Sequence, residues 1–422
     1  MFLNSKSRFY FNISITQNIK FCFKKIFNVS SKNQYSSNFI SDLYKGSDIY
    51  HLEHGRSAFY LFLTTLKKKT NKRKIIINSF TLFEMINMII YSDFEPLLVD
   101  LKSNSFETNL ENIIEKNKDD LAAVVITHLN GFNENIFQVK ENIDRLNNNR
   151  TEKIFLIEDC AVSLGAKKKS FYAGKIGDYA ILSFNIMKNI TTLTGGVLID
   201  NYKKLDINTN LKSFNNKKNI SSIKQSCFVF LLQILNSKIF FPFFFQFIKF
   251  SYRINLNFFL KKYRTDFKVF TKKQIPEDYL EKMDPLKKEL LTNQLKKIHE
   301  DQNLRIKKAK IYYDKLKKLE CFFFPQTNFD ESNIFIDFPI ICKNDELKKK
   351  IWKKSLKKNI DIKNYYYTNC GTEKIFKKYG GNEEFLNSKN IEKNIFMLPV
   401  NKNFNQKDIE KVIQFLIDTV NA

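Results

Sequence analysis

Short apolar runs alternate with segments of helical periodicity along much of the chain. Residues 54–69 open with a glycine turn and continue with helical spacing, and residues 82–91 repeat that spacing. Apolar runs of strand length occur at 74–80, 96–101, 122–129, 153–160, 179–184 and 195–200. Because strands that alternate with helices pair in parallel and are covered on both faces, the pattern predicts an α/β fold with a largely parallel sheet.

The character of the chain changes between residues 206 and 270. Residues 226–252 are apolar and aromatic, but polar residues, lysines and a proline interrupt them, so neither half reaches the roughly 20 apolar residues that span a bilayer. Two interpretations remain open. The segment is a pair of helices lying in a membrane surface, or it is a buried insertion or dimer contact.

The remainder of the chain predicts a connection and a second domain. Residues 286–319 have the spacing of one long amphipathic helix, and a strand (334–342), a helix (344–359) and a terminal helix (406–420) follow. The predicted organisation is an arm (1–50), a large domain (51–205), the apolar insertion (206–270), a connecting helix (271–320) and a small α/β domain (321–422).

Composition excludes several classes of protein. The formal net charge of +26 favours anionic partners, but a skew towards Lys, Asn, Ile and Phe is also what an AT-rich genome produces. No nucleic-acid-binding module accompanies the charge, so we expect no nucleic-acid partner. Six scattered cysteines form no C-x-x-C pair, which predicts a reduced, cytoplasmic chain without a metal site. The N-terminus lacks the apolar core of a secretory signal, so we expect no secretion. If residues 226–250 contact a membrane, the protein would be attached peripherally at the inner face of that membrane.

Three stretches carry candidate chemistry. The run at 153–160 brings Asp159 to a strand end, where α/β proteins bind ligands. The run at 179–184 brings Ser183 to a second strand end, and Lys188 follows directly. The turn at 54–58 begins a helix, and backbone N–H groups at a helix start suit a phosphate.

Together these residues form the set that pyridoxal phosphate requires. The cofactor needs a lysine for its aldehyde, a carboxylate for its ring nitrogen, a helix start with hydroxyls for its phosphate, and an apolar cover for its ring. Lys188, Asp159, Ser183 with Ser57, and the segment 77–83 can supply these in turn. The sequence therefore predicts a pyridoxal phosphate site.

These motifs resemble the DegT-type (DegT/DnrJ/StrS) sugar aminotransferases, fold-type I enzymes that act on nucleotide-linked keto-sugars. The matching stretches cover roughly 50–200 and 275–420. The resemblance implies a mainly parallel seven-stranded sheet in the large domain, a smaller C-terminal α/β domain and a homodimer. It also implies that Lys188 holds the cofactor; the cofactor-binding positions would be Asp159, Ser183, Gly55, Arg56, Ser57, Leu82, Phe83 and Asn185.

The chain departs from the family pattern at several of its positions. Leu82 stands where the family has an aromatic residue, Val162 where it has Gln or His, and Asn185 where it often has His. The stretch that reaches the partner subunit's cofactor in the family reads Glu281-Lys282-Met283-Asp284 here. A branch of the family that performs dehydration has histidine in place of the lysine, and Lys188 argues against that branch.

The sequence thus predicts an aminotransferase that converts a nucleotide-linked or lipid-linked keto-sugar to an amino-sugar, with glutamate as donor, in surface polysaccharide or glycan biosynthesis. The main alternative is an inactive relative that binds cofactor or sugar as a sensor or scaffold. Another pyridoxal phosphate chemistry would share the same site. His128 and Glu158 stay open between a pocket role and a structural one.

Overall fold

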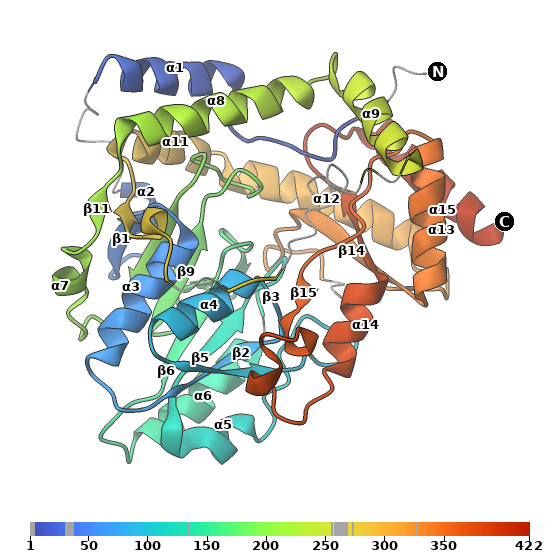
Figure 1. Ribbon diagram of the computed structural model, residues 1–422. Coiled ribbons are helices and arrows are strands. Elements are labelled where there is room, and N and C mark those ends of the chain that lie inside the picture. Colours follow the sequence, from blue (N-terminus) through green and yellow to red (C-terminus); the bar gives the residue numbers. More distant parts are fainter. Residues whose placement is uncertain are drawn as a thin grey trace.

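The computed structural model of the chain describes residues 5–29, 38–133, 135–254, 256, 269–271, 274–325 and 328–422. Within them, the main sheet has nine strands in the order β11-β12-β1-β10-β9-β6-β5-β2-β4 (Figure 1). Its strands are β1 (Asp48–Leu52), β2 (Lys74–Asn78), β4 (Glu95–Val99), β5 (Leu121–Thr127), β6 (Phe155–Asp159), β9 (Tyr179–Ser183), β10 (Gly196–Asp200), β11 (Asn215–Asn216) and β12 (Glu281–Lys282).

The predicted parallel sheet is confirmed. Strands β4, β2, β5, β6 and β9 run parallel, and β10 lies antiparallel between β9 and β1. All six apolar runs of the sequence are strands of this sheet. The seventh long strand, β1, is half-buried over much of its length, and the two-residue strands β11 and β12 extend the sheet beyond it.

Helices cover both faces of the sheet. Alternate residues of β5 enter two cores: Val124 and Ile126 pack with α6 (Asn135–Asn147), whereas Ala123 and Val125 pack with α3 (Gly55–Lys67) and α4 (Phe83–Tyr91). A strand buried on both sides must be apolar throughout, which is why β5 is a continuous apolar run. Shorter elements are α2 (Asn38–Leu43), α5 (Ile113–Asn117), α7 (Ile207–Leu211), β7 (Lys167–Lys168) and β8 (Phe171–Tyr172).

The single helix predicted over 286–319 is wrong, because the chain breaks between α11 (Pro285–Leu295) and α12 (Ile298–Leu316). Leu291 and Leu295 of α11 pack into the core of the large sheet, whereas Ala309 and Tyr312 of α12 pack into the C-terminal core. The break lets each helix bury its own apolar face. Helical periodicity by itself does not register such a change of direction.

The C-terminal part has its own sheet and core. Within the described residues, β13 (Phe322–Phe323), β14 (Asp337–Cys342) and β16 (Ile395–Pro399) form an antiparallel sheet. The helices α12, α13 (Asp345–Lys357) and α15 (Gln406–Asn421) contribute to its core. Between β14 and β16, the strand β15 (Thr368–Asn369) pairs with β3 (Phe80–Thr81) in a separate two-stranded sheet, and α14 (Leu386–Asn394) follows. Because β3 directly follows β2, this pairing brings the C-terminal part of the chain against the large domain.

The arm and the insertion meet on one side of the molecule. Helix α1 (Ile15–Ile26) lies alongside α8 (Asn219–Leu235), and α9 (Phe241–Arg253) follows α8 (Figure 1). Asn18 of α1 donates hydrogen bonds from Nδ2 to the carbonyl oxygen of Ser226 and to Gln233 Oε1. In the described part of the chain, no helix has the length and apolar character to cross a membrane. The domain limits drawn from the sequence stay a prediction.

Candidate active site

A cavity of about 360 Å³ lies at the carboxyl ends of the parallel strands. Three neighbouring strands end at its wall, with Thr127 on β5, Asp159 on β6 and Ser183 on β9. Parallel strands present their carboxyl ends at one edge of a sheet, so residues far apart in the sequence converge here. The starts of α3 and α4, the turn after β9 and residues of the C-terminal part complete the wall.

Lys188 lies in the turn after β9 and lines this cavity. Its backbone N–H donates to the carbonyl oxygen of Asn185, which fixes the turn. The pKa of Lys188 is lowered to about 8, chiefly by loss of solvent around the ammonium group; Asp159 opposes this shift, and the positive charges of Lys363 and Arg56 add to it. An amine with that pKa is partly unprotonated near neutral pH, as a nucleophile must be.

Asp159 ends β6 and is buried in the wall of the same cavity. Burial raises the pKa of its carboxyl group; the opposing influences are, in order, the backbone N–H of Ala161, Lys188 and His128. Asp159 Oδ1 accepts the Ala161 N–H at 3.0 Å, which holds the carboxylate in place. The structure thus brings Lys188 and Asp159 to one cavity, close enough for each to influence the pKa of the other.

The predicted phosphate turn lies against the end of β9. A Cβ at Gly55 would be 3.1 Å from Ser183 Cβ and 3.2 Å from the Leu182 carbonyl oxygen, so a side chain there would press on the strand. Glycine lets the first turn of α3 approach Ser183 closely. Gly55, Ser183 and Asn185 all line the cavity, next to a helix N-terminus that attracts anions.

Not every predicted residue faces the cavity in this way. Arg56 lines it, but its guanidinium is held by Glu84 at 2.7 Å and lies over the ring of Tyr279. Leu82 also lines the cavity. Ser57 and Phe83 are buried and are not among the residues of the wall; Phe83 packs on Phe270 with 5.2 Å between ring centroids.

The cavity has an aromatic wall that the sequence interpretation missed. Tyr365, Tyr366 and Tyr367 line it from the C-terminal part, and the centroids of the last two rings are 4.5 Å apart. The hydroxyl of Tyr366 is buried without a hydrogen-bond partner, and burial raises the pKa of this residue. Three consecutive tyrosines were the signal available in the sequence.

Asn130 also lines the cavity, and the sequence interpretation did not single it out. It follows β5 with a left-handed backbone (φ 60°) and lies at the wall of the cavity, where Val162 is also found. Its side-chain amide is fully buried, and neither the oxygen nor the nitrogen has a hydrogen-bond partner. Buried amides are nearly always hydrogen-bonded, so this group is suited to a polar ligand atom.

The residues present fit pyridoxal phosphate. Gly55 and Ser183 form a cradle for an anion, Asp159 provides a buried carboxylate, and Lys188 provides an amine of lowered pKa. The tyrosine wall gives an aromatic ring a surface to pack on. The unpartnered amide of Asn130 provides a donor and an acceptor for polar groups of the ligand.

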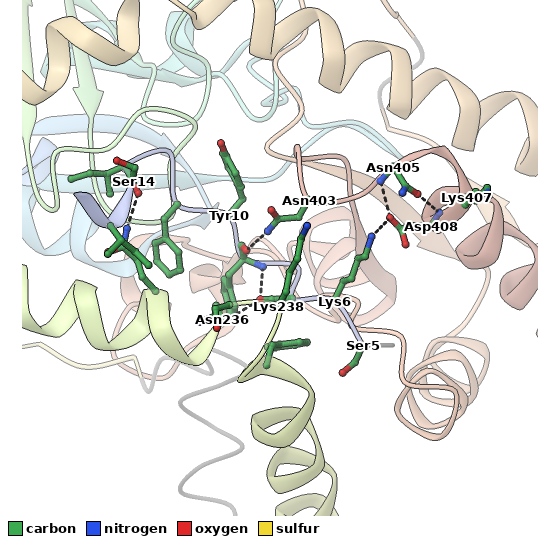
Figure 2. A pocket seen from close by; sticks show the side chains of 18 of the residues that line it. Ser5, Lys6, Tyr10, Ser14, Asn236, Lys238, Asn403, Asn405, Lys407 and Asp408 are labelled. Atoms are coloured by element: carbon green, nitrogen blue, oxygen red, sulfur yellow. Dashed lines mark hydrogen bonds and ion pairs between the residues drawn. The ribbon is translucent and has the colours of Figure 1, made fainter. Parts of the chain in front are cut away.

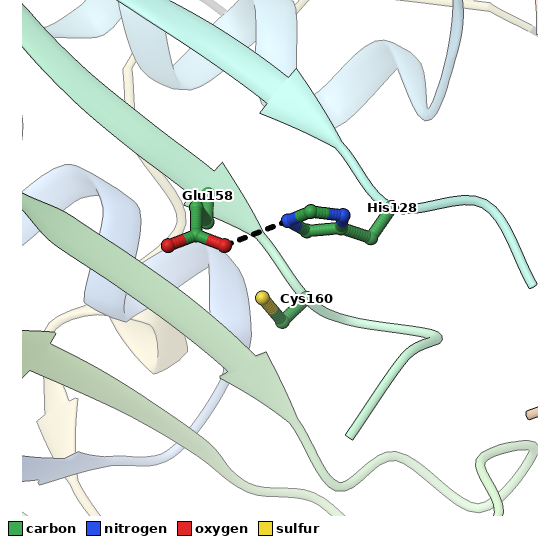
Figure 3. Close-up of side chains that lie close together, drawn as sticks. All are labelled: His128, Glu158 and Cys160. Carbon is green, nitrogen blue, oxygen red and sulfur yellow. Dashed lines mark hydrogen bonds and ion pairs between the residues drawn. The ribbon is translucent and has the colours of Figure 1, made fainter. Parts of the chain in front are cut away.

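A buried cluster of His128, Glu158 and Cys160 lies behind the strand ends (Figure 3). His128 Nε2 lies 2.8 Å from Glu158 Oε2, and His128 Nδ1 accepts the Asn133 N–H at 2.9 Å. The same carboxylate accepts the backbone N–H groups of residues 174, 176 and 177. Because these lone pairs are engaged, His128 and Glu158 hold the loop after β8 in place. Neither side chain lines the cavity, so both have a structural role.

The stretch that replaces the partner-reaching motif is used within this chain. Glu281 and Lys282 form β12 beside β1, and Glu281 pairs with Lys217 at 2.6 Å. Met283 is buried, and Asp284 caps α11 through the Leu286 N–H. The degraded motif therefore has a structural role at the edge of the sheet.

Comparison with known proteins agrees with the fold and the motifs. The model of the DegT/DnrJ/EryC1/StrS aminotransferase family matches residues 51–223 and 264–417. GDP-perosamine synthase of Escherichia coli O157:H7 is 28% identical over 180 residues, which are 42% of this chain and 48% of that protein. The matched part thus spans about half the length of this curated relative.

Solved structures extend the likeness to the whole fold. The aminotransferase PseC of Helicobacter pylori, involved in the biosynthesis of pseudoaminic acid, superposes with a TM-score of 0.71 at 14% identity, covering 99% of this chain and 100% of that one. Ntda from Bacillus subtilis with bound cofactor PMP gives a TM-score of 0.66 at 14% identity, covering 99% and 87%. At these identities the likeness shows the fold. The family match over most of the chain shows that it belongs to the DegT/DnrJ/EryC1/StrS aminotransferase family.

Proposed function

We propose that this protein is a pyridoxal phosphate-dependent aminotransferase that converts a nucleotide-linked keto-sugar to an amino-sugar. The observation that supports it most is that Lys188, with its pKa lowered to about 8, and the buried Asp159 line the same cavity. The glycine turn at Gly55 beside Ser183 supplies the matching phosphate cradle.

Each residue has a distinct task in this reaction. When bound, pyridoxal phosphate supplies an aldehyde that takes up an amino group and a ring that accepts electrons. Lys188 would bind the aldehyde as a neutral amine with release of water. Once the amino group of the donor has displaced it, the freed Lys188 amine would move a proton between the Cα of the amino acid and the cofactor carbon. Asp159 holds a proton at the ring nitrogen. Ser183 and the start of α3 hold the phosphate.

In this proposal, the tyrosine wall and Asn130 take over the roles of the aromatic residue that the family has at position 82 and of the Gln or His that it has at position 162. Residues 365–367, which line the cavity, would give the cofactor ring the aromatic surface that Leu82 does not, and would exclude water from it. The amide of Asn130 supplies a polar contact on the side where Val162 offers none.

The proposed substrate rests on the named relatives and on the net charge of the chain. GDP-perosamine synthase carries a nucleotide sugar in its name, and the net charge of +26 suits a diphosphate-linked sugar. We propose glutamate as donor, surface polysaccharide or glycan biosynthesis as the pathway class, a homodimer as the functional unit, and the cytoplasm as the location. Attachment to the inner face of the membrane through 226–250 is part of this proposal, and a lipid-linked sugar is the variant it would allow.

A half-reaction tests the proposal. Purified protein is loaded with pyridoxal phosphate and mixed with glutamate, and the absorption band of the cofactor should shift as the amino group is taken up. Lys188→Ala should bind cofactor without this shift. A band that is unchanged by glutamate in the wild-type protein would identify the inactive binding relative instead. Nucleotide keto-sugars are then screened for return of the original band.

A further inference from the structure

Three helices that belong to the arm and the insertion share an unusually apolar outer surface. On α1, the exposed large side chains are Ile15, Ile19, Phe23 and Ile26, and Phe27 follows directly. On α8, Ile220, Phe228 and Leu231 are exposed by more than half. These helices lie along the same side of the molecule as α9 (Figure 1). We call the outer surface of α1, α8 and α9 the apolar face.

Helix α9 is apolar on two opposite sides. Phe241, Phe245 and Ile248 are buried in the C-terminal core. Phe240, Phe243 and Phe250 point outward and are 51%, 66% and 55% exposed. A helix that only packs on its own domain needs one apolar stripe, and the other side is ordinarily polar. The outer phenylalanines therefore indicate a second apolar partner.

The segments that build this face lack acidic residues. No Asp or Glu occurs in residues 1–41 or in residues 207–265. The exposed charged groups on the three helices are basic, including Lys20, Lys224 and Arg253, and Lys238 lies between α8 and α9. Glu289 of the neighbouring α11 is engaged by Lys24 at 2.8 Å. Phenylalanine stripes flanked by Lys and Arg are the pattern of helices that lie in the headgroup region of a membrane.

A hollow at the rim of the apolar face adds to this charge (Figure 2). It has a volume of about 720 Å³ and lies between the arm, the start of α9 and α15. Four lysines line it, namely Lys6, Lys238, Lys407 and Lys411. Among the described residues of its wall, Asp408 is the one acid, and it is engaged by Lys6 at 2.6 Å. The hollow therefore has an excess of positive charge suited to phosphate groups.

Extending the membrane attachment of the proposed function, on which this inference rests, we propose that the apolar face docks on a bilayer that contains anionic phospholipids. The outer phenylalanines of α9 and α1 enter the boundary between headgroups and acyl chains, and the lysines around them contact lipid phosphates. A second copy fits this face poorly, because a two-fold contact would set an acid-free, lysine-bearing surface against itself. The N-terminal arm is thus part of the membrane surface, together with the insertion.

The test measures binding of the full-length protein to vesicles. Flotation with vesicles of phosphatidylcholine and phosphatidylglycerol should recover the wild-type protein, whereas vesicles of phosphatidylcholine alone should recover much less. Each outward phenylalanine contributes about tenfold in affinity. We therefore expect the triple variant F240S/F243S/F250S to lose about a thousandfold, and F23S/F27S to lose about a hundredfold. Raising the salt concentration should also weaken binding.

A matched control separates this effect from a general loss of surface apolar area. The triple variant F171S/F323S/L386S removes side chains that are 40%, 41% and 61% exposed away from the apolar face, and it should bind vesicles like the wild type. Equal loss in both triple variants, equal recovery on neutral vesicles, or no recovery of the wild type would overturn the proposal. A face variant that turns a dimer into a monomer, by light scattering, while vesicle binding persists would also overturn it. The glutamate half-reaction in solution is independent of all these outcomes.

Discussion

The lowered pKa of Lys188 gives the sharpest test of the site. At pH 7.5, a pKa of about 8 leaves about a quarter of the Lys188 amines unprotonated, against about 0.1% for a lysine of pKa 10.5. Lys188 should therefore react with an aldehyde roughly 200 times faster than an ordinary lysine at that pH. As the pH rises through 8, its reactivity should level off, because the amine is then largely neutral.

The assay traps the reacted amine. Cofactor-free protein is mixed with pyridoxal phosphate at a series of pH values, quenched with borohydride, and digested for peptide mass mapping. Lys308 is an internal control, because burial lowers its pKa to about 8 as well, while its Nζ donates to the Asn401 carbonyl oxygen outside the cavity. Lys188 should be labelled in preference to Lys308, because of these two lysines it is Lys188 that lies beside the phosphate cradle.

Two variants should move the pH midpoint of Lys188 labelling in opposite directions. Asp159→Asn removes the charge that raises the pKa of Lys188, so the midpoint should fall. Lys363→Met removes a neighbouring cation, so the midpoint should rise. The midpoint of Lys308 should stay where it is in both. Labelling of Lys188 with a midpoint near 10.5, or a shift of both variants in the same direction, would refute the reasoning.

Four further changes test other parts of the structure. Asn130→Leu removes the unpartnered amide at the cavity wall and should weaken cofactor binding about tenfold, measured by equilibrium dialysis, with unfolding in urea unchanged or improved. Gly55→Ala places a methyl group against the end of β9 and should also lower cofactor affinity about tenfold or more; unaltered affinity would argue against the phosphate cradle. Lys287→Met removes the nearer of the two ammonium groups beside the buried carboxylate of Glu53, leaving Lys217 3.6 Å away, and should cost about 3 kcal/mol of unfolding free energy in a urea titration. Lys349→Met breaks an exposed pair and should leave the unfolding free energy almost unchanged in the same titration.

The sheet could be predicted because its strands are buried on both faces and therefore read as apolar runs. Strand β1 escaped this signal because its three central residues are half-buried and its first, Asp48, is exposed. The break between α11 and α12 escaped because its cause is tertiary. The Gln294 side chain donates to the Thr191 carbonyl oxygen and accepts its N–H, which ties the end of α11 to the loop after β9.

Strand order decides one part of the site, and that part could be predicted from the sequence. Asp159, Ser183 and Lys188 follow the ends of neighbouring parallel strands, so the topology alone brings them to one edge. The tyrosine wall depends on a contact that no local pattern encodes, the pairing of Thr368 with Thr81 between β15 and β3. That bridge joins positions almost 290 residues apart and places the residues just before it over the cavity.

Helix geometry explains why Ser57 lies outside the wall. Successive residues of a helix turn by about 100°, so Gly55 and Ser57 at the start of α3 differ by about 200° in direction. When Gly55 packs on Ser183 beside the cavity, Ser57 must face the opposite side, where it is buried. Leu82 precedes α4 with an extended backbone and lines the cavity, whereas Phe83, the first residue of that helix, is buried in the core. A motif that names consecutive helix residues therefore marks the turn that binds the ligand, and the period of the helix decides which side chain in it can reach the ligand.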